Sequence, residues 1–435
     1  MITLLSFIIL LVLICFGNFF EGNLFFSYVS ILIFLSWILY VFVKNRDFFI
    51  SSIYMLYAVI STIIVSLVLE YGIYLIEINE VSYSIGVPYK ACFQIFVFLL
   101  GSLLVFNFFK KTNLSIVSLN SGNTQIIRYF FRSIVVIFLV IIGFIALKYG
   151  TPLQYGVHRN DYWAYYAPTW GSVITYWLMQ FTFVFGYFYS KDKSKIDIIL
   201  FLCILSCIFI MGERFTGLLY SLVFFSLPIL LNKTKINFNL SWGRKVIFAS
   251  LGVIFISYAL YSSFIKSQST LNPLEQATLR TSLQAQMWWS LDKITDNIPQ
   301  DEDVIIRKYL GFGASDRDSG VYYLMDQVAS KEIVDNRFES KSRFTMSGFF
   351  SNTYFFGYFL GTFVNFLWGL VFGFLTYSLY LGILSNNVLF VFVIYKLFFK
   401  IQAIILNATI PDIFSFETIV FLTIILFFFR IRSLK

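Results

Sequence analysis

Residues 127–148 read IRYFFRSIVVIFLVIIGFIALK, and no charged side chain occurs between Arg132 and Lys148. An α-helix of about 20 predominantly apolar residues is long enough to cross the hydrocarbon core of a bilayer. The stretch therefore predicts a transmembrane helix rather than one surface helix of a water-soluble domain.

Similar apolar runs recur along the whole 435-residue chain, which is 59% hydrophobic and 13% charged. Soluble domains carry about twice that charged fraction, so a soluble enzyme with a single membrane anchor is excluded. We predict an all-α polytopic membrane helix bundle of about 12 transmembrane helices, with one large, partly helical periplasmic loop. The predicted spans are 2–17, 24–43, 48–69, 89–109, 127–148, 168–189, 197–212, 216–232, 246–264, 357–383, 388–407 and 414–430.

The distribution of basic residues predicts the orientation of these spans. If the N-terminus is cytoplasmic, the segments on that side hold sixteen Lys or Arg residues against three acids. The short segments on the other side hold only Lys90, Lys148, Arg159 and Arg214. Because basic side chains resist translocation, we expect both termini of this multi-pass protein to be cytoplasmic.

One polar segment, 265–347, divides the chain into nine predicted spans (1–264), the loop itself and three further spans (348–435). Asn272, Pro273 and Glu275 form a typical helix start. The helix would place several residues along one face: Leu274, Ala277, Gln284, Trp288 and Leu291. A second helix is predicted over 321–329. A loop of this length is usually functional rather than a connector.

The predicted outer loop 150–168 contains His158, the chain's single histidine, followed by Arg159 and Asp161. A histidine pKa near neutrality would let His158 take a proton from an attacking hydroxyl. The neighbouring aromatic side chains would stack on sugar faces. The alternative is an aromatic belt at the membrane surface with a solvated histidine and arginine.

The tight turn Gly212-Glu213-Arg214-Phe-Thr-Gly217 lies between two predicted spans. An arginine held there offers a planar fork to phosphate oxygens. The alternatives are a surface pair of Arg214 with Glu213, or Arg214 reaching the lipid headgroups.

Other basic residues of the outer side are weaker candidates. Arg280 lies early on the predicted loop helix, close to the mouth of the bundle, and Lys400 lies within a predicted span, where it would hold an anionic lipid head. The D-x-D sequence at 316–318 resembles a glycosyltransferase metal signature, but a solvated turn is favoured. The four cysteines lie in apolar stretches, so no metal site is expected.

The chain resembles the Wzy-type O-antigen polymerases, a group of oligosaccharide repeat-unit polymerases related to O-antigen ligases. The likeness covers the layout of spans and late loop, the turn at 212–217, and the stretch from Ser347 through Gly357 and Gly361 to Gly373. Arg337, ten residues and Gly348 also fit a periplasmic R-x10-G pattern proposed in the family.

The resemblance implies transfer of a growing glycan from undecaprenyl pyrophosphate to a lipid-linked repeat unit at the periplasmic face of the bacterial inner membrane. We expect a single inverting displacement that needs neither metal nor cofactor, because cationic side chains would neutralise the departing pyrophosphate. The expected base is His158, Asp161 or Glu213, and the expected pyrophosphate ligands are Arg159, Arg214, Arg280 and Lys400. Expected glycan contacts are Tyr162, Trp163, Tyr166, Gln284 and Trp288.

The expected partners are the lipid-linked oligosaccharide, membrane lipids and a chain-length regulator protein, and not nucleic acid. Two other functions stay open. An O-antigen ligase differs only in its acceptor, the lipid A core. A flippase of lipid-linked sugars would instead show paired repeats and polar residues lining a midplane cavity, and the sequence has no such repeat.

Overall fold

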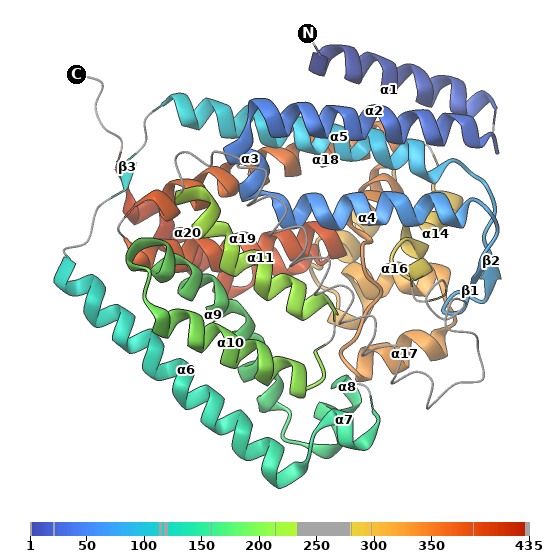
Figure 1. Ribbon diagram of the computed structural model, residues 1–435. Helices are drawn as coiled ribbons and strands as arrows, with labels where there is room; N and C mark the ends of the chain where they lie inside the picture. Colours follow the sequence, from blue (N-terminus) through green and yellow to red (C-terminus); the bar gives the residue numbers. More distant parts are fainter. Residues whose placement is uncertain are drawn as a thin grey trace. The chain divides into compact units, whose positions relative to one another are not determined.

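The computed structural model describes residues 2–20, 22–112, 115–116, 121–157, 159–213, 215–232, 279, 281–296, 298–385 and 387–430 (Figure 1). The chain divides into two compact units. The first unit comprises Met1–Val117, Ala277–Gly382 and Leu389–Lys435, and the second comprises Ser118–Gln276 and Ile383–Val388.

The first unit is built from long apolar helices at both ends of the chain. Its helices outside the polar loop are α1 (Ile2–Phe19), α2 (Leu24–Lys44), α3 (Arg46–Ser51), α4 (Ile53–Leu69), α5 (Val87–Lys111), α18 (Gly348–Leu384), α19 (Val388–Asn407) and α20 (Phe416–Phe428). Two short antiparallel pairs accompany them: β1 (Tyr74–Leu75) with β2 (Glu80–Val81), and β3 (Ser115–Ile116) with β4 (Phe429–Arg430).

The polar loop also belongs to the first unit, and its described part is helical. Its elements are α14 (Gln286–Ile294), α15 (Glu302–Val304), η2 (Ile305–Tyr309), η3 (Asp316–Asp318), α16 (Gly320–Val328) and α17 (Lys331–Glu339). The predicted helix over 321–329 is therefore confirmed as α16. The earlier predicted helix lies partly outside the described residues, and a turn at 283–285 separates its described part from α14.

The second unit contains α6 (Ser121–Tyr149), α7 (Pro152–Tyr155), α8 (Arg159–Asp161), η1 (Tyr162–Tyr166), α9 (Trp170–Asp192), α10 (Lys195–Ile210) and α11 (Phe215–Asn232). Helix α9 packs against α6, α10 and α11. At one end, Asp197 is fully buried and accepts hydrogen bonds from Arg128 and Arg132. These bonds tie α6 to α10.

Among the described residues, six helices are long and apolar enough to cross a membrane: α1, α2, α5, α6, α18 and α19. Every predicted span that falls on described residues coincides with a helix, although a break at Ser52 divides the third span into α3 and α4. The predicted span 246–264 lies outside the described residues.

Helix α18 is two helical segments rather than one. The side-chain amide of Asn352 donates to Asn365 at 2.6 Å, although thirteen residues of straight helix would separate them by about 20 Å. The chain reverses at Gly357, whose φ of 72° and ψ of 167° lie in a region that only glycine adopts readily. Residues 348–356 therefore fold back along the long segment that follows Gly357, where the sequence predicted only the beginning of a span.

A buried polar network fixes this reversal. Asn352 also accepts a hydrogen bond from the Tyr309 hydroxyl at 2.8 Å, and Asn365 donates to the carbonyl of Phe349 at 3.2 Å. Tyr309 in turn accepts from the indole of Trp368 at 3.4 Å. Because unpaired polar groups are costly beside hydrocarbon, these bonds hold the folded-back segment in one register.

Replacing Gly357 by alanine is expected to destabilise the protein by about 1–3 kcal/mol, because a Cβ forces strained backbone at the reversal. The matched control is Gly143→Ala in α6, where a Cβ would meet no atom within 4 Å. There alanine is expected to be neutral or stabilising by up to about 1 kcal/mol. Chemical unfolding of the purified variants in detergent micelles measures both changes. Equal stability of the two variants would show that the reversal is not strained by a side chain.

Candidate functional site

The second unit brings together two segments that the sequence singled out separately. The turn between α10 and α11 packs beneath the loop that follows α6. Gly212 has a φ of 84°, and a Cβ on it would lie 3.1 Å from the Cβ atoms of both Pro152 and Arg159. Arg159 also forms an ion pair with Glu213 of the same turn. Glycine is required here both by the backbone conformation and by the close approach of the loop.

Glu213 is the buried member of this ion pair. Its side chain is 8% exposed, whereas that of Arg159 is 38% exposed. The Glu213 carboxylate lies against Gly217 in the first turn of α11, where a Cβ would come within 2.4 Å of a carboxylate oxygen. The positive end of the helix dipole stabilises a carboxylate at that place. Glu213 is thus shielded, and it orients the guanidinium of a partly exposed arginine.

The Arg159 guanidinium is a potential anion ligand. Partial burial lowers its pKa from the ordinary value, but arginine stays protonated at any physiological pH. The guanidinium carries five N–H donors, and the ion pair with Glu213 is a contact of one of its nitrogens. Donors of such a fork match the paired oxygens of a phosphate.

The aromatic residues of this loop differ sharply in exposure. Tyr162 is fully buried and donates to the carbonyl of Gly150 at 2.7 Å, and Trp163 is 7% exposed. Neither exposes a ring face in this structure, so their assignment as glycan contacts gains no support here and stays a prediction. Tyr166 is 43% exposed and keeps that possibility.

Two further aromatic residues of the loop are exposed. Tyr165 is 78% exposed, and Tyr155 is 48% exposed with its ring centroid 4.7 Å from that of Tyr166. The π-helix over Tyr162–Tyr166 turns consecutive aromatic residues to different sides, which no simple sequence period foresees.

Three predicted residues, His158, Arg214 and Arg280, lie outside the described residues. Asp161 is described and exposed at the end of α8. The roles assigned to these four residues stay predictions.

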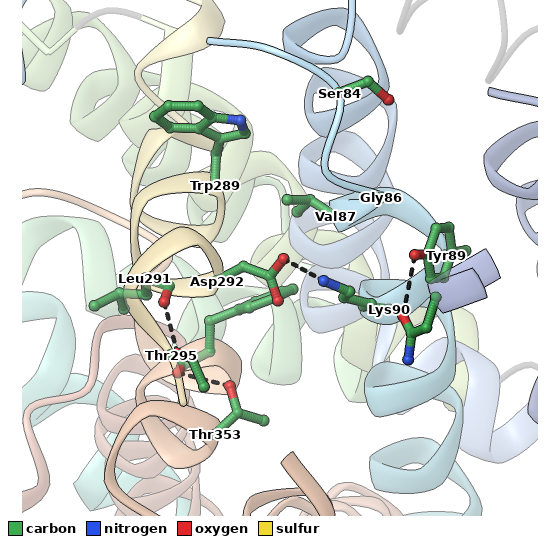
Figure 2. Close-up of polar contacts among 12 residues, drawn as sticks. Ser84, Gly86, Val87, Tyr89, Lys90, Trp289, Leu291, Asp292, Thr295 and Thr353 are labelled. Carbon is green, nitrogen blue, oxygen red and sulfur yellow. Dashed lines mark hydrogen bonds and ion pairs between the residues drawn. The ribbon is translucent and has the colours of Figure 1, made fainter. Parts of the chain in front are cut away.

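In the first unit, a partly buried ion pair joins α5 to α14. The Lys90 ammonium donates to the Asp292 carboxylate at 2.7 Å, and these side chains are 19% and 6% exposed (Figure 2). One turn earlier on α14, the Trp289 indole donates to the carbonyl of Tyr83 at 2.9 Å. From the sequence, Lys90 was identified only as a basic residue of the outer side. Its pairing could not be predicted from local patterns, because Asp292 lies 202 positions away.

The start of α5, which carries Lys90, is fixed by a buried carboxylate. Glu70, 5% exposed, accepts the backbone N–H groups of Gly86 and Val87 at 3.1 and 3.0 Å. Burial raises the pKa of Glu70, whereas the hydrogen bonds it accepts lower it. A carboxylate at a helix N-terminus is also favoured by the helix dipole.

A second carboxylate of the same region links three segments. Glu77, in the connection between β1 and β2, accepts hydrogen bonds from Arg337 of α17 and from the amide of Gln286 of α14. Arg337, which the R-x10-G pattern marked, is therefore held by an acid within its own unit. Glu77 thus joins the β1–β2 connection to two helices of the polar loop.

The remaining predicted residues of the first unit are engaged in other ways. Trp288 is fully buried beside Phe349 and Phe350, so its assignment as a glycan contact gains no support from the structure and stays a prediction. Gln284 is exposed in the turn before α14 and does not share the buried face of Trp288. Lys400 donates to Ser415 at 2.6 Å and to Glu417 at 2.9 Å.

The D-x-D segment is a structural turn. Arg317 forms ion pairs with Asp326 and Asp335, and its hydrogen bonds to Asp326 raise its pKa. Asp318 accepts the Ser315 hydroxyl at 2.6 Å. Within the described part of the chain, no group of three or more His, Cys, Asp or Glu residues is placed to hold a metal ion.

Comparison with known proteins gives one partial match. Residues 314–422 match a model described as a family of unknown function, DUF6418. This segment runs from the Arg317 turn through the reversal at Gly357 into α20. No curated protein and no solved structure matches the chain.

Breaking the Lys90–Asp292 pair is expected to lower the free energy of unfolding, and to lower it more when the lysine is replaced than when the aspartate is. Lys90→Met leaves Asp292 buried without its cation and should destabilise by about 3 kcal/mol. Asp292→Asn should cost less, because a lysine stem is long enough to carry its charge to water. The double variant should lose much less than the sum of the single losses.

The control is Lys293→Met on the same helix, because the Lys293–Glu80 pair is 32% and 37% exposed. An exposed pair contributes at most about 1 kcal/mol. The unfolding free energies of the wild type, the two single variants and the double variant, measured in micelles at one ionic strength, form the double-mutant cycle that tests the pairing. Additive losses for Lys90 and Asp292 would contradict the assigned pairing.

Proposed function

We propose that the chain is a membrane glycosyltransferase that polymerises undecaprenyl-pyrophosphate-linked repeat units at the outer face of the bacterial inner membrane, with both termini in the cytoplasm. The contact between Arg159 and Glu213 carries the proposal. It joins two segments that the sequence singled out separately for this reaction, and the Arg159 side chain stays 38% exposed in a loop that also carries exposed aromatic residues.

A departing pyrophosphate needs cations that are already in position when negative charge develops. We assign this task to Arg159, held by Glu213 and Gly212, together with Arg214, which follows Glu213 in the sequence. Glu213 is engaged by Arg159 and by the start of α11, so we assign it to positioning rather than to proton transfer. The base is then His158, which precedes Arg159 in the sequence, or the exposed Asp161.

The proposed step is a single displacement at the anomeric carbon. The acceptor hydroxyl forms the new glycosidic bond and gives its proton to the base, while the bond to undecaprenyl pyrophosphate breaks with its electron pair. Attack from the opposite face inverts the anomeric centre. Tyr155, Tyr165 and Tyr166 offer exposed rings for the glycan, as stacking on a sugar requires.

Loss of the Arg159 side chain tests the pyrophosphate assignment. Hydrogen bonds to charged groups contribute about 1.5–3 kcal/mol, so Arg159→Ala should slow elongation by about tenfold or more and shorten the polysaccharide ladder. Arg159→Lys should retain part of the activity, because lysine keeps the charge but loses the planar fork. Glu213→Gln should give an intermediate loss.

The matched control is Arg307→Ala, which removes an exposed arginine paired with Asp303 within one helical turn. Each variant is expressed in a strain lacking the chromosomal gene, and immunoblots of membranes establish equal amounts. A full-length ladder from Arg159→Ala at wild-type abundance would refute the role of Arg159.

Deletion of the gene separates the proposed activity from its two rivals. Loss of a polymerase should leave a single repeat unit on the cell surface. Loss of a ligase should leave the lipid A core without repeats, and loss of a flippase should strand precursors inside. Gel analysis of surface polysaccharide with lipid-linked precursor extraction reads all three outcomes, and either of the last two would overturn the proposal.

A further inference from the structure

A groove of about 440 Å³ lies between α6 and α10 of the second unit. Its walls include Leu139, Gly143 and Ala146 on α6, and Cys203, Ser206 and Ile210 on α10. Gly143, Cys203, Ser206 and Ile210 are exposed, so the groove opens at the surface of the helix pair. Its volume falls within the range of sites that bind small organic ligands.

The glycine in this groove does not serve close helix packing. In the same unit, Gly186 of α9 lets α11 approach so closely that a Cβ would lie 2.1 Å from the carbonyl oxygen of Phe225. A Cβ on Gly143 would meet nothing within 4 Å. Glycine within a helix costs about 0.5–1 kcal/mol relative to alanine, and no contact among the residues that the structure describes offsets that cost here.

We infer that this groove holds a segment of the polyprenyl chain of the lipid-linked substrate, an assignment that rests on the proposed function. Helix α6 is long and apolar enough to span the membrane, so the groove opens toward hydrocarbon. An apolar hollow does not retain water, and a flexible hydrocarbon chain fills it with favourable contacts.

The charge at one end of the groove specifies a lipid with an anionic head. Met211 lines the groove and is followed directly by Gly212, against which Arg159 packs. A phosphate bound by the partly exposed Arg159 would therefore have the adjoining groove for its first hydrocarbon units. Ile199 also lines the groove, and its Cα lies about 18 Å along α10 from that of Met211, which leaves room for several such units.

Photolabelling of the full-length protein in lipid nanodiscs tests this assignment. The probe is a polyprenyl phosphate with a diazirine in its chain, and the comparison probe is phosphatidylglycerol with a diazirine in its acyl chain. The polyprenyl probe should label α6 and α10 at least fivefold more than the phosphatidylglycerol probe. Gly143→Phe and Ser206→Phe each fill the groove and should reduce this labelling at least fivefold.

The matched control is Val140→Phe, which adds the same aromatic ring at a 67% exposed position of α6 outside the groove. It should leave the labelling unchanged. Size-exclusion elution of each variant at the wild-type position establishes that it is folded. The assignment is overturned if Gly143→Phe and Ser206→Phe are labelled as strongly as the wild type, or if both probes label the protein equally.

A second copy of the chain is the other candidate occupant. Oxidation with a membrane-permeable catalyst would then join the exposed Cys203 of two copies, and a disulfide dimer lost in Cys203→Ser would overturn the polyprenyl assignment. Failure of the Arg159 ladder test with groove labelling retained removes the proposed polymerase but keeps a polyprenyl site. If Arg159→Ala shortens the ladder but neither groove variant reduces the labelling, only the groove assignment is overturned.

Discussion

A charge placed beside hydrocarbon must be neutralised by a partner or reach water, and this constraint organises both units. Asp197 is fully buried between two arginines of α6, and Asp292 meets Lys90. Each of these contacts joins segments that are far apart in the sequence. The pairs therefore determine which helix ends lie together, while the apolar faces supply most of the contact area.

The same constraint gives Arg159 its distinctive character. Its partner Glu213 is the more buried of the two residues and lies at the start of α11, so the pair is oriented from within the fold. A surface ion pair between two mobile side chains would leave both groups free to rearrange. Here the guanidinium is oriented by a buried partner while the Arg159 side chain stays 38% exposed, an arrangement that would suit a preorganised anion site.

Glycine serves opposite purposes at different places in this chain. Gly369 lets α18 approach α5 so closely that a Cβ would lie 2.1 Å from the Phe98 carbonyl oxygen, and Gly357 permits the reversal that positions Asn352. Gly143 instead leaves space. In a bilayer, space between two apolar helices is space for a lipid chain, which links the groove to the lipid-linked substrate proposed for the neighbouring arginine.

Local composition was enough to locate the long apolar helices of the described residues and the polar segment between them, because the free energy of a segment in hydrocarbon depends on its own composition and length. Sequence patterns also marked the two segments that meet at Arg159 and Glu213.

Only the packing of the chain determines which aromatic side chains are buried: Tyr162, Trp163 and Trp288 are, whereas Tyr165 and Tyr166 are exposed. Packing likewise pairs Lys90 with Asp292. It alone decided that α18 reverses at Gly357, since an apolar run containing glycine is compatible with a straight helix or a folded one. Exposure and pairing depend on which surfaces meet in space, and local residue patterns carry no information about a partner two hundred positions away.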